Sequence, residues 1–189
     1  LGHTSLMGAV NSGQVEAVGV LVEAGSDLDA RSNTGQTGLM LASGKGYREI
    51  VELLIAKGAD CNFRIKSEYN ATPLIACVWR DGSGFDETSS APFVRAFACL
   101  PEVDPGLCAD RNTALTSCVD RQRNEFVAAI CARGKGAYLD APNSEGMTPL
   151  QKACQFGRTK SAEILLRAGC NPNAGSKSPL GLAIWHCSD

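Results

Sequence analysis

The sequence has few of the residues on which catalysis and metal binding most often depend. It contains only two histidines, His3 and His186, and only 6% aromatic residues among 189. None of its nine cysteines belongs to a C-x-x-C pair, and their number is odd, so we expect neither a zinc cluster nor a closed disulfide framework. We expect buried, reduced core thiols, which are typical of an intracellular protein, cytoplasmic or nuclear.

Long apolar runs and an excess of one charge are also absent. No run approaches the roughly 18 apolar residues that span a membrane, and 18 Lys and Arg against 20 Asp and Glu give a net charge of −2. We therefore expect no nucleic-acid partner and no membrane insertion. An apolar content of 44% predicts a folded chain. Because the chain begins at Leu1 without an initiator Met or a signal peptide, we expect an excised piece of a longer protein.

A short motif recurs six times along the chain. Its clearest copies read T-P-L-I-A-C from Thr72 and T-P-L-Q-K-A from Thr148, and the steps between copies are 33, 35, 41, 35 and 30 residues. The leading residues are Thr4, Thr37, Thr72, Thr113, Thr148 and Ser178. Self-similarity at such a period predicts a repeat architecture.

A second motif follows the first in each well-formed unit. It reads L-L-I-A-K-G-A-D-C-N from Leu53, with related copies from Leu21 and Leu165. Each unit is therefore predicted as turn, helix, tight turn, helix and Gly stop. The leading Thr or Ser caps the first helix, and Pro fits its first position. The predicted breaks between helices are Gly13, Gly46 and Gly157, and the predicted stops after the second helix are Gly25, Gly58 and Gly169.

The period and the T-P-L-H-x-A-like motif resemble the ankyrin repeat over essentially the whole chain. The resemblance implies an all-α class: one ankyrin-repeat domain over 1–189, built of helix-turn-helix units joined by β-hairpin-like turns. The predicted units are 1–31, 32–64, 65–108, 109–141, 142–174 and a partial 175–189, with a hairpin insertion near 66–70 and a flexible insertion at about 82–90.

The sequence departs from the family pattern at several positions. The signature His is replaced in every unit, by Met7, Met40, Ile75, Thr116, Gln151 and Gly181. Pro101 stands where the third unit would have its closing Gly, and Lys135-Gly136 are extra residues in the fourth. We expect these changes to weaken local hydrogen bonding without changing the fold.

The candidate catalytic and metal motifs are all incomplete. In a repeat stack the two histidines would lie about 40–50 Å apart, because successive units advance by roughly 8–10 Å, so they cannot share a site. Asp86-Glu87 lacks the spacing of a calcium loop. Asn70-Ala71-Thr72 matches a glycosylation sequon, but Thr72 opens a helix and we expect no modification there. The sequence therefore predicts no enzyme, no cofactor, no metal and no small-molecule substrate.

The resemblance implies that a partner protein is contacted by the hairpin tips and by the last two residues of each first helix. We call the latter the ladder positions, and they are Asn11-Ser12, Gly44-Lys45, Trp79-Arg80, Asp120-Arg121, Gln155-Phe156 and Trp185-His186. Both tryptophans of the chain fall on the ladder, and Trp and Arg are enriched at interface hot spots. The alternative is an intrachain role: Trp79 under the 82–90 segment, and Trp185 over the last unit.

The predicted partner-binding residues on the ladder are Lys45, Trp79, Arg80, Arg121, Phe156 and Trp185. At the hairpin tips they are Asn33, Thr34, Gln36, Tyr69, Arg111, Ser144, Glu145 and Met147. The resemblance also implies one modification site, because animal ankyrin repeats can be hydroxylated at the Asn of L-x5-[DE]-x-N. Leu54, Asp60 and Asn62 fit that frame, and the alternative for Asn62 is a purely structural hydrogen bond.

These observations predict a non-catalytic protein–protein interaction module that binds a partner through its concave groove and hairpin tips. Two alternatives remain open. The chain could be a regulatory or targeting arm of a larger enzyme, channel or ligase subunit, or a structural subunit of a large assembly. In either case the partner would be another protein, or the rest of a larger chain or complex.

Overall fold

The computed structural model describes residues 2–64, 71–78, 93–94, 97–98, 100–101, 103–107, 112–134 and 136–175. The regular elements within these ranges are helices, and no β-strand occurs there, so the predicted all-α class is confirmed. The chain forms two compact units, Leu1–Gly82 and Ser83–Asp189, and each is described by itself. None of the described helices is both long and apolar enough to cross a membrane.

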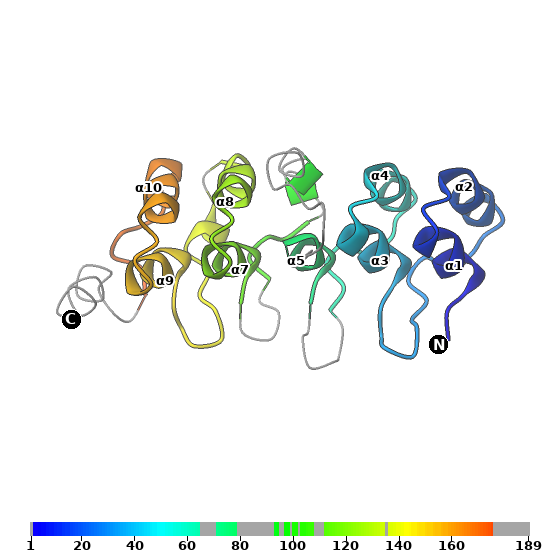
Figure 1. Ribbon diagram of the computed structural model, residues 1–189, viewed down its shortest axis with the longest axis horizontal. Helices are drawn as coiled ribbons and strands as arrows, with labels where there is room; N and C mark the ends of the chain where they lie inside the picture. Colours follow the sequence, from blue (N-terminus) through cyan, green and yellow to red (C-terminus); the bar gives the residue numbers. More distant parts are fainter. Residues whose placement is uncertain are drawn as a thin grey trace. The chain divides into compact units, whose positions relative to one another are not determined.

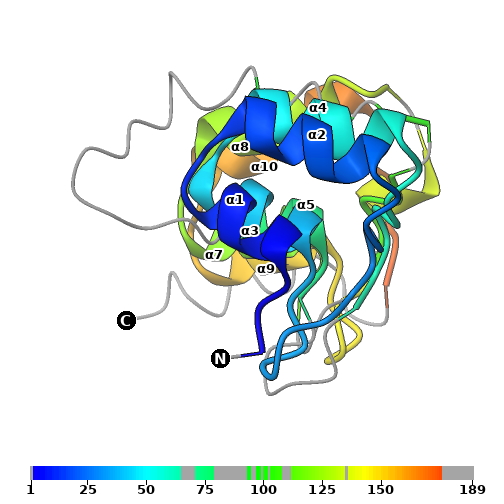
Figure 2. The same cartoon turned by 90° about the vertical axis from the view of Figure 1, so that its right-hand side faces the viewer.

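The described residues of the first unit form five helices, which lie in two rows (Figure 1). They are α1 (Ser5–Asn11), α2 (Val15–Glu23), α3 (Gly38–Lys45), α4 (Arg48–Ala56) and α5 (Pro73–Val78). Helices α1, α3 and α5 follow one another in the row of first helices, and α2 packs on α4 in the row of second helices. The end-on view separates the two rows clearly (Figure 2).

The second unit repeats this arrangement. It holds α7 (Ala114–Asp120), α8 (Asn124–Cys131), the 3-10 helix η1 (Ala137–Leu139), α9 (Pro149–Gln155) and α10 (Thr159–Ala168). Here α7 packs against α9 and α8 against α10, so two helix pairs are stacked. The segment that precedes α9 hangs below the first helices as a narrow loop, like the segment that precedes α3 in the first unit (Figure 1).

The predicted helix caps are present wherever the structure describes them. The Oγ1 atoms of Thr4, Thr37, Thr72, Thr113 and Thr148 each accept a hydrogen bond from the backbone N–H three residues on, at 3.2–3.4 Å. At Thr148 the cap is reciprocal, because Gln151 Oε1 accepts from the backbone N–H of Thr148 at 2.9 Å. Thr116, another residue in place of the signature His, also bonds to its capping threonine, since its Oγ1 donates to the carbonyl of Thr113 at 3.1 Å.

Each core lies between the two rows of helices. In the first unit it includes Leu6, Val10, Val18, Leu39, Ile50 and Leu54, and in the second Leu115, Phe126, Ile130, Leu150 and Leu165. The described residues that stand in place of the signature His are also buried; they are Met7, Met40, Ile75, Thr116 and Gln151. The six described cysteines are thiols; five are buried and Cys154 is half-buried.

The turns between helices use glycine as the sequence predicts. Gly13, Gly46 and Gly157 have φ of 69°, 72° and 63°, and each separates a first helix from a second. This left-handed conformation is open to glycine at little cost. Both predicted insertions, near 66–70 and at 82–90, lie outside the described residues.

Candidate partner-binding face

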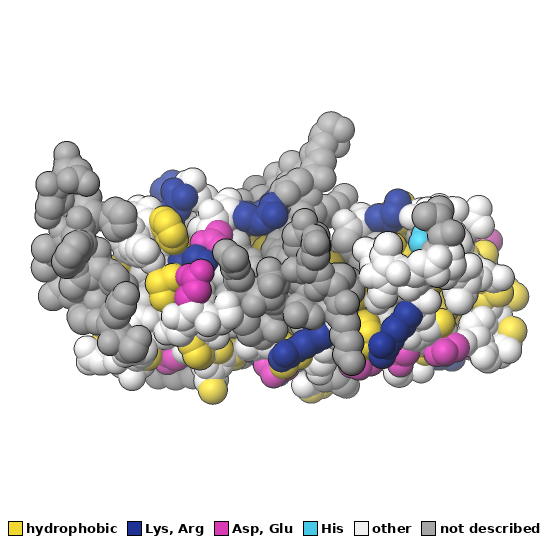
Figure 3. Space-filling model, turned by 90° about the horizontal axis from the view of Figure 1, so that it is seen from below, with side chains coloured by type: hydrophobic (Ala, Val, Ile, Leu, Met, Phe, Trp, Pro, Cys, Tyr) yellow, Lys and Arg dark blue, Asp and Glu magenta, His cyan; other side chains and the backbone are white. Residues whose placement is uncertain are grey.

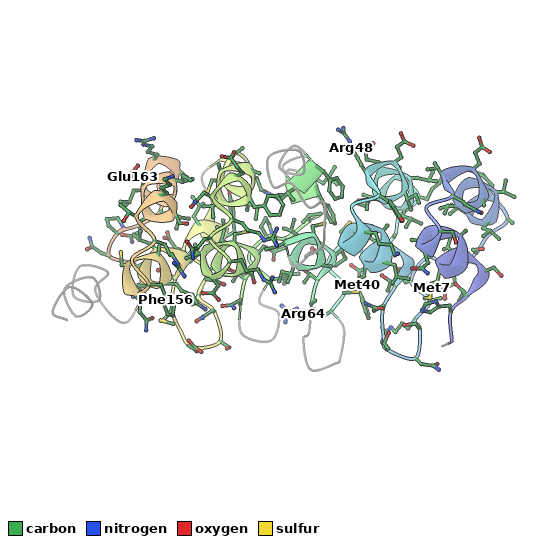
Figure 4. All side chains as sticks on the ribbon, in the orientation of Figure 1. Met7, Met40, Arg48, Arg64, Phe156 and Glu163 are labelled. Carbon is green, nitrogen blue, oxygen red and sulfur yellow. The ribbon has the colours of Figure 1, made fainter. Side chains whose placement is uncertain are left out.

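Of the six predicted partner-binding residues on the ladder, three lie within the described ranges, and all three are exposed. Lys45 ends α3, while Arg121 and Phe156 are the C-caps of α7 and α9. Phe156 is 47% exposed, although the helix that it follows is otherwise mostly buried. It lies below α9, on the side of the hanging loops (Figure 4). Trp79, Arg80 and Trp185 fall outside the described residues.

Figure 3 looks onto the side from which these loops hang. In its left part, where the second unit lies, hydrophobic, basic and acidic side chains adjoin one another. A mixed surface of this kind suits a peptide or protein partner better than a polyanion, because a nucleic-acid surface is dominated by basic side chains.

The hairpin tip of the first unit is fixed by its own hydroxyl groups. The backbone closes between Ser32 and Gln36, with the N–H of Ser32 donating to the carbonyl of Gln36 at 3.0 Å. The Ser32 and Thr34 hydroxyls are hydrogen-bonded at 2.8 Å, and Thr34 Oγ1 donates to Gln36 Oε1 at 3.3 Å. The tip residue Asn33 is therefore exposed on a rigid turn.

A single asparagine organises the hairpin tip of the second unit. Asn143 is 5% exposed, and its Oδ1 accepts from the backbone N–H groups of Glu145 and Met147 at 3.0 and 2.9 Å. Glu145 is exposed at the tip and Met147 is half-buried. Ser144 is also exposed, whereas Tyr69 and Arg111 lie outside the described residues.

A partly buried ion pair connects this hairpin to the ladder. Lys152 Nζ lies 2.9 Å from Asp120 Oδ2, and the two side chains are 7% and 30% exposed. Asn112 bridges them: its Oδ1 accepts from Lys152 at 2.7 Å and its amide donates to Asp120 at 3.0 Å. Asn143 donates to the same Asn112 oxygen at 3.5 Å. The charge of the Asp120 carboxylate, next to Arg121 in the sequence, is therefore neutralised by Lys152.

The sequence analysis predicted neither this network nor a second contact, in which Gln122, with its amide oxygen toward the guanidinium group, accepts from Arg158 at 2.8 Å. Lys152 occupies a helix position that carries no family signature, so nothing marked it in the sequence. Gln122 was detectable, because it stands where the corresponding turns have Gly13, Gly46 and Gly157.

The predicted modification site is accessible in part. Asn62 is half-buried, and its backbone N–H donates to Asp60 Oδ1 at 2.9 Å. The backbone N–H of Asp60 in turn donates to Asp29 Oδ1 at 2.9 Å, so the turn is tied to the preceding repeat. These bonds use backbone N–H groups and not the Asn62 side chain, so both the hydroxylation of Asn62 and its structural alternative stay predictions.

Hydrogen bonding and burial shift the pKa of several described groups. The pKa of the Glu23 carboxyl is lowered by a hydrogen bond from Lys57 at 2.6 Å. Burial raises the pKa of the Cys131, Cys154 and Cys170 thiols, which suppresses the thiolate that a nucleophile needs. Among the described residues no cluster of His, Cys, Asp and Glu has the geometry of a metal site.

A family model for ankyrin repeats in three copies matches residues 6–88 and 86–176. The chain belongs to the ankyrin-repeat family. Ankyrin repeats are generally protein–protein interaction modules. The ankyrin repeat domain of Bcl-3, described as a unique member of the IκB protein family, has a similar solved structure. The TM-score is 0.78 at 27% identity, over 96% of this chain and 80% of that one. No curated protein matches this ankyrin-repeat chain.

Proposed function

We propose that this chain is a non-catalytic interaction domain that binds a protein partner through its ladder and its hairpin tips. The partner is a separate protein or another region of a longer chain, and it meets the face as an extended segment. The proposed contact residues are Lys45, Trp79, Arg80, Arg121, Phe156 and Trp185 on the ladder, and Asn33, Tyr69, Arg111, Glu145 and Met147 at the tips.

The observation that carries this proposal is the exposure of Phe156. Among the described residues, Val20 and Leu166 are the other large hydrophobic side chains exposed to a similar or greater degree. Both stand on second helices, α2 and α10. An aromatic side chain that is half exposed at a helix end, on the same ladder as the exposed Arg121, has the composition of an interface hot spot.

The rigid hairpins support the same proposal. A preorganised contact surface loses little side-chain and backbone entropy on binding, so more of the contact energy appears as affinity. At the two described tips, Asn143 Oδ1 and Ser32 Oγ accept hydrogen bonds from backbone N–H groups of the same turn and so fix its backbone. Truncation of one aromatic or arginine anchor on such a surface costs about 2–4 kcal/mol of binding free energy.

A capture experiment with two matched double variants tests the proposal. The test variant Arg121→Ala/Phe156→Ala removes one cation and one hydrophobic side chain from the ladder. The control variant Leu166→Ala/Arg167→Ala removes the same pair of types from α10, where Leu166 is 48% exposed and the Arg167 side chain is 82% exposed. Both variants are first checked for the parent's helical signal and unfolding midpoint.

We expect proteins captured by the parent from the source lysate to be retained by the control variant and lost from the ladder variant, as measured by quantitative mass spectrometry. Retention by both variants would contradict binding through the ladder. Loss from the α10 variant alone would assign binding to the row of second helices instead.

A further inference from the structure

Gln122 has the one left-handed backbone among the described non-glycine residues, with φ of 56°. It lies in the turn between α7 and α8, where the equivalent turns have Gly13, Gly46 and Gly157 at φ of 63–72°. A side chain in this conformation costs about 1 kcal/mol or more relative to glycine. Glycine would form the same turn without this cost, but it could not make the contact that the Gln122 side chain makes.

That interaction is with Arg158, in the corresponding turn of the next helix pair. With its amide oxygen toward the guanidinium group, Gln122 accepts from the two terminal nitrogens of Arg158 at 2.8 and 3.3 Å. The first unit has an apolar version of the same contact. There the Tyr47 ring lies over Gly13, so close that a Cβ on Gly13 would stand 3.2 Å from Tyr47 Cζ. Tyr47 and Arg158 are equivalent, because each follows the turn glycine and caps a second helix.

The positive charge of Arg158 is not neutralised within the described part of the chain. Arg158 is half-buried, and no described carboxylate lies within ion-pair distance of it. Its Nε is buried without an acceptor, and Gln155 Oε1, in the same turn region, is buried without a donor. A half-buried guanidinium group held by one neutral amide retains most of its capacity to bind a carboxylate.

The surrounding charges favour an acidic ligand. The turn at 155–160 carries Arg158 and the exposed Lys160 and no acidic residue. Asp120, the next acid along the ladder, is already paired with Lys152 at 2.9 Å. Phe156 supplies an exposed apolar surface two residues before Arg158.

We infer that the Gln122–Arg158 pair binds the carboxylate of an acidic side chain on the protein partner. Gln122 is the positioning residue, and Arg158 contacts the carboxylate. An apolar residue next to that acid contacts Phe156. This inference rests on the proposed function, because it assigns the partner's chemistry at one end of the ladder face.

The probe is a pair of blocked peptides, acetyl-Glu-Leu-Glu-Leu-amide and acetyl-Gln-Leu-Gln-Leu-amide. Each is titrated into the 15N-labelled chain while the Arg158 Nε–Hε NMR cross-peak is followed, after assignment with an Arg158→Lys variant. We expect this cross-peak to shift saturably with the Glu peptide and to respond at least tenfold more weakly to the Gln peptide, since a charge-assisted hydrogen bond changes affinity by about that factor. Equal responses to both peptides would overturn the inference.

The decisive variant is Gln122→Gly/Arg158→Tyr, which installs the pair found in the first unit. Because it removes the strained φ and restores a packing that this fold already uses, we expect an unfolding midpoint no lower than the parent's. The variant lacks the Arg158 cross-peak, so the backbone amide of the neighbouring Gly157 is followed instead. We expect this amide to shift with the Glu peptide in the parent and not in the variant. A shift that persists at full size in this folded variant would overturn the inference.

Two further controls separate the proposed contact from general attraction. The Nε–Hε cross-peaks of the exposed residues Arg48 and Arg167 measure non-specific attraction of the Glu peptide to arginine side chains. Shifts of these peaks as large as that of Arg158 would contradict a specific contact. Inorganic phosphate tests the other common anion: a saturable shift with phosphate but none with the Glu peptide would also overturn the carboxylate assignment.

The two proposals fail separately. A specific Glu-peptide response with partner capture unaffected by Arg121→Ala/Phe156→Ala would sink the proposed function alone. Loss of capture by that variant with no Glu-peptide response would sink the carboxylate inference alone.

Discussion

Arg133 donates from one guanidinium nitrogen to the backbone carbonyl of Val103, thirty residues earlier, at 2.7 Å. The same nitrogen lies 2.8 Å from the carbonyl of Ala98 and 3.0 Å from that of Leu100. These carbonyls flank Pro101, the residue that replaces a closing glycine in the sequence pattern. A side chain from the end of α8 thus supplies the donor that an ordinary repeat turn would find in its own backbone.

Replacing Arg133 with Met should therefore loosen the segment at 97–107. Three carbonyls would lose a charged donor, and hydrogen bonds to charged groups contribute about 1.5–3 kcal/mol, so we expect the free energy of unfolding to fall by about 2 kcal/mol. Amide hydrogen exchange measured by mass spectrometry should accelerate at 97–107 and stay unchanged in α10. The control Arg167→Met removes an exposed arginine and should change neither quantity; faster exchange in both variants would contradict the assigned role.

The ion pair of Lys152 and Asp120 should respond asymmetrically to mutation. Lys152 is 7% exposed and Asp120 is 30% exposed, so removal of the carboxylate leaves the better buried charge without its counter-ion. We expect Asp120→Ala to cost about 3 kcal/mol, and Lys152→Met about 1 kcal/mol, because the remaining carboxylate is partly solvated. Urea unfolding of both variants measures the two costs, and equal costs would contradict the predicted asymmetry.

Two buried serines should respond in opposite directions to alanine. Ser43 is fully buried, and its hydroxyl has no hydrogen-bond partner. Ser161 is equally buried, but its hydroxyl donates to Asn124 Oδ1 at 2.8 Å. An unsatisfied buried hydroxyl costs about 1–3 kcal/mol, so Ser43→Ala should raise the urea midpoint and Ser161→Ala should lower it. The comparison fails if Ser43→Ala is as destabilising as Ser161→Ala.

The repeat architecture could be predicted from the sequence because it depends on local signals. Thr37 and Thr148 mark helix starts because their hydroxyls cap the first turn, and Gly46 and Gly157 mark turns because glycine adopts a positive φ at little cost. The contacts of Lys152 and Arg158 could not be predicted in the same way. They join residues about one repeat apart, and their geometry depends on how neighbouring helices are stacked. The role of Arg133 is still harder to predict, because it depends on Pro101, a departure from the repeat pattern about thirty residues earlier.

The thiols of Cys131 and Cys170 should make the second unit sensitive to alkaline pH. Burial raises the pKa of Cys131 from 9.0 to about 12 and that of Cys170 from 9.0 to about 11. Above pH 9 the unfolded chain releases protons that the folded chain keeps, so the free energy of unfolding falls as pH rises. This contribution is complete below pH 9 and is lost between pH 9 and about 12.

Urea midpoints measured from pH 7 to 10.5 should decline more steeply above pH 9 for the parent than for Cys131→Ala/Cys170→Ala, while the two slopes agree between pH 7 and 8. Parallel decline above pH 9 would mean that other groups, such as lysines or tyrosines, cause the alkaline loss.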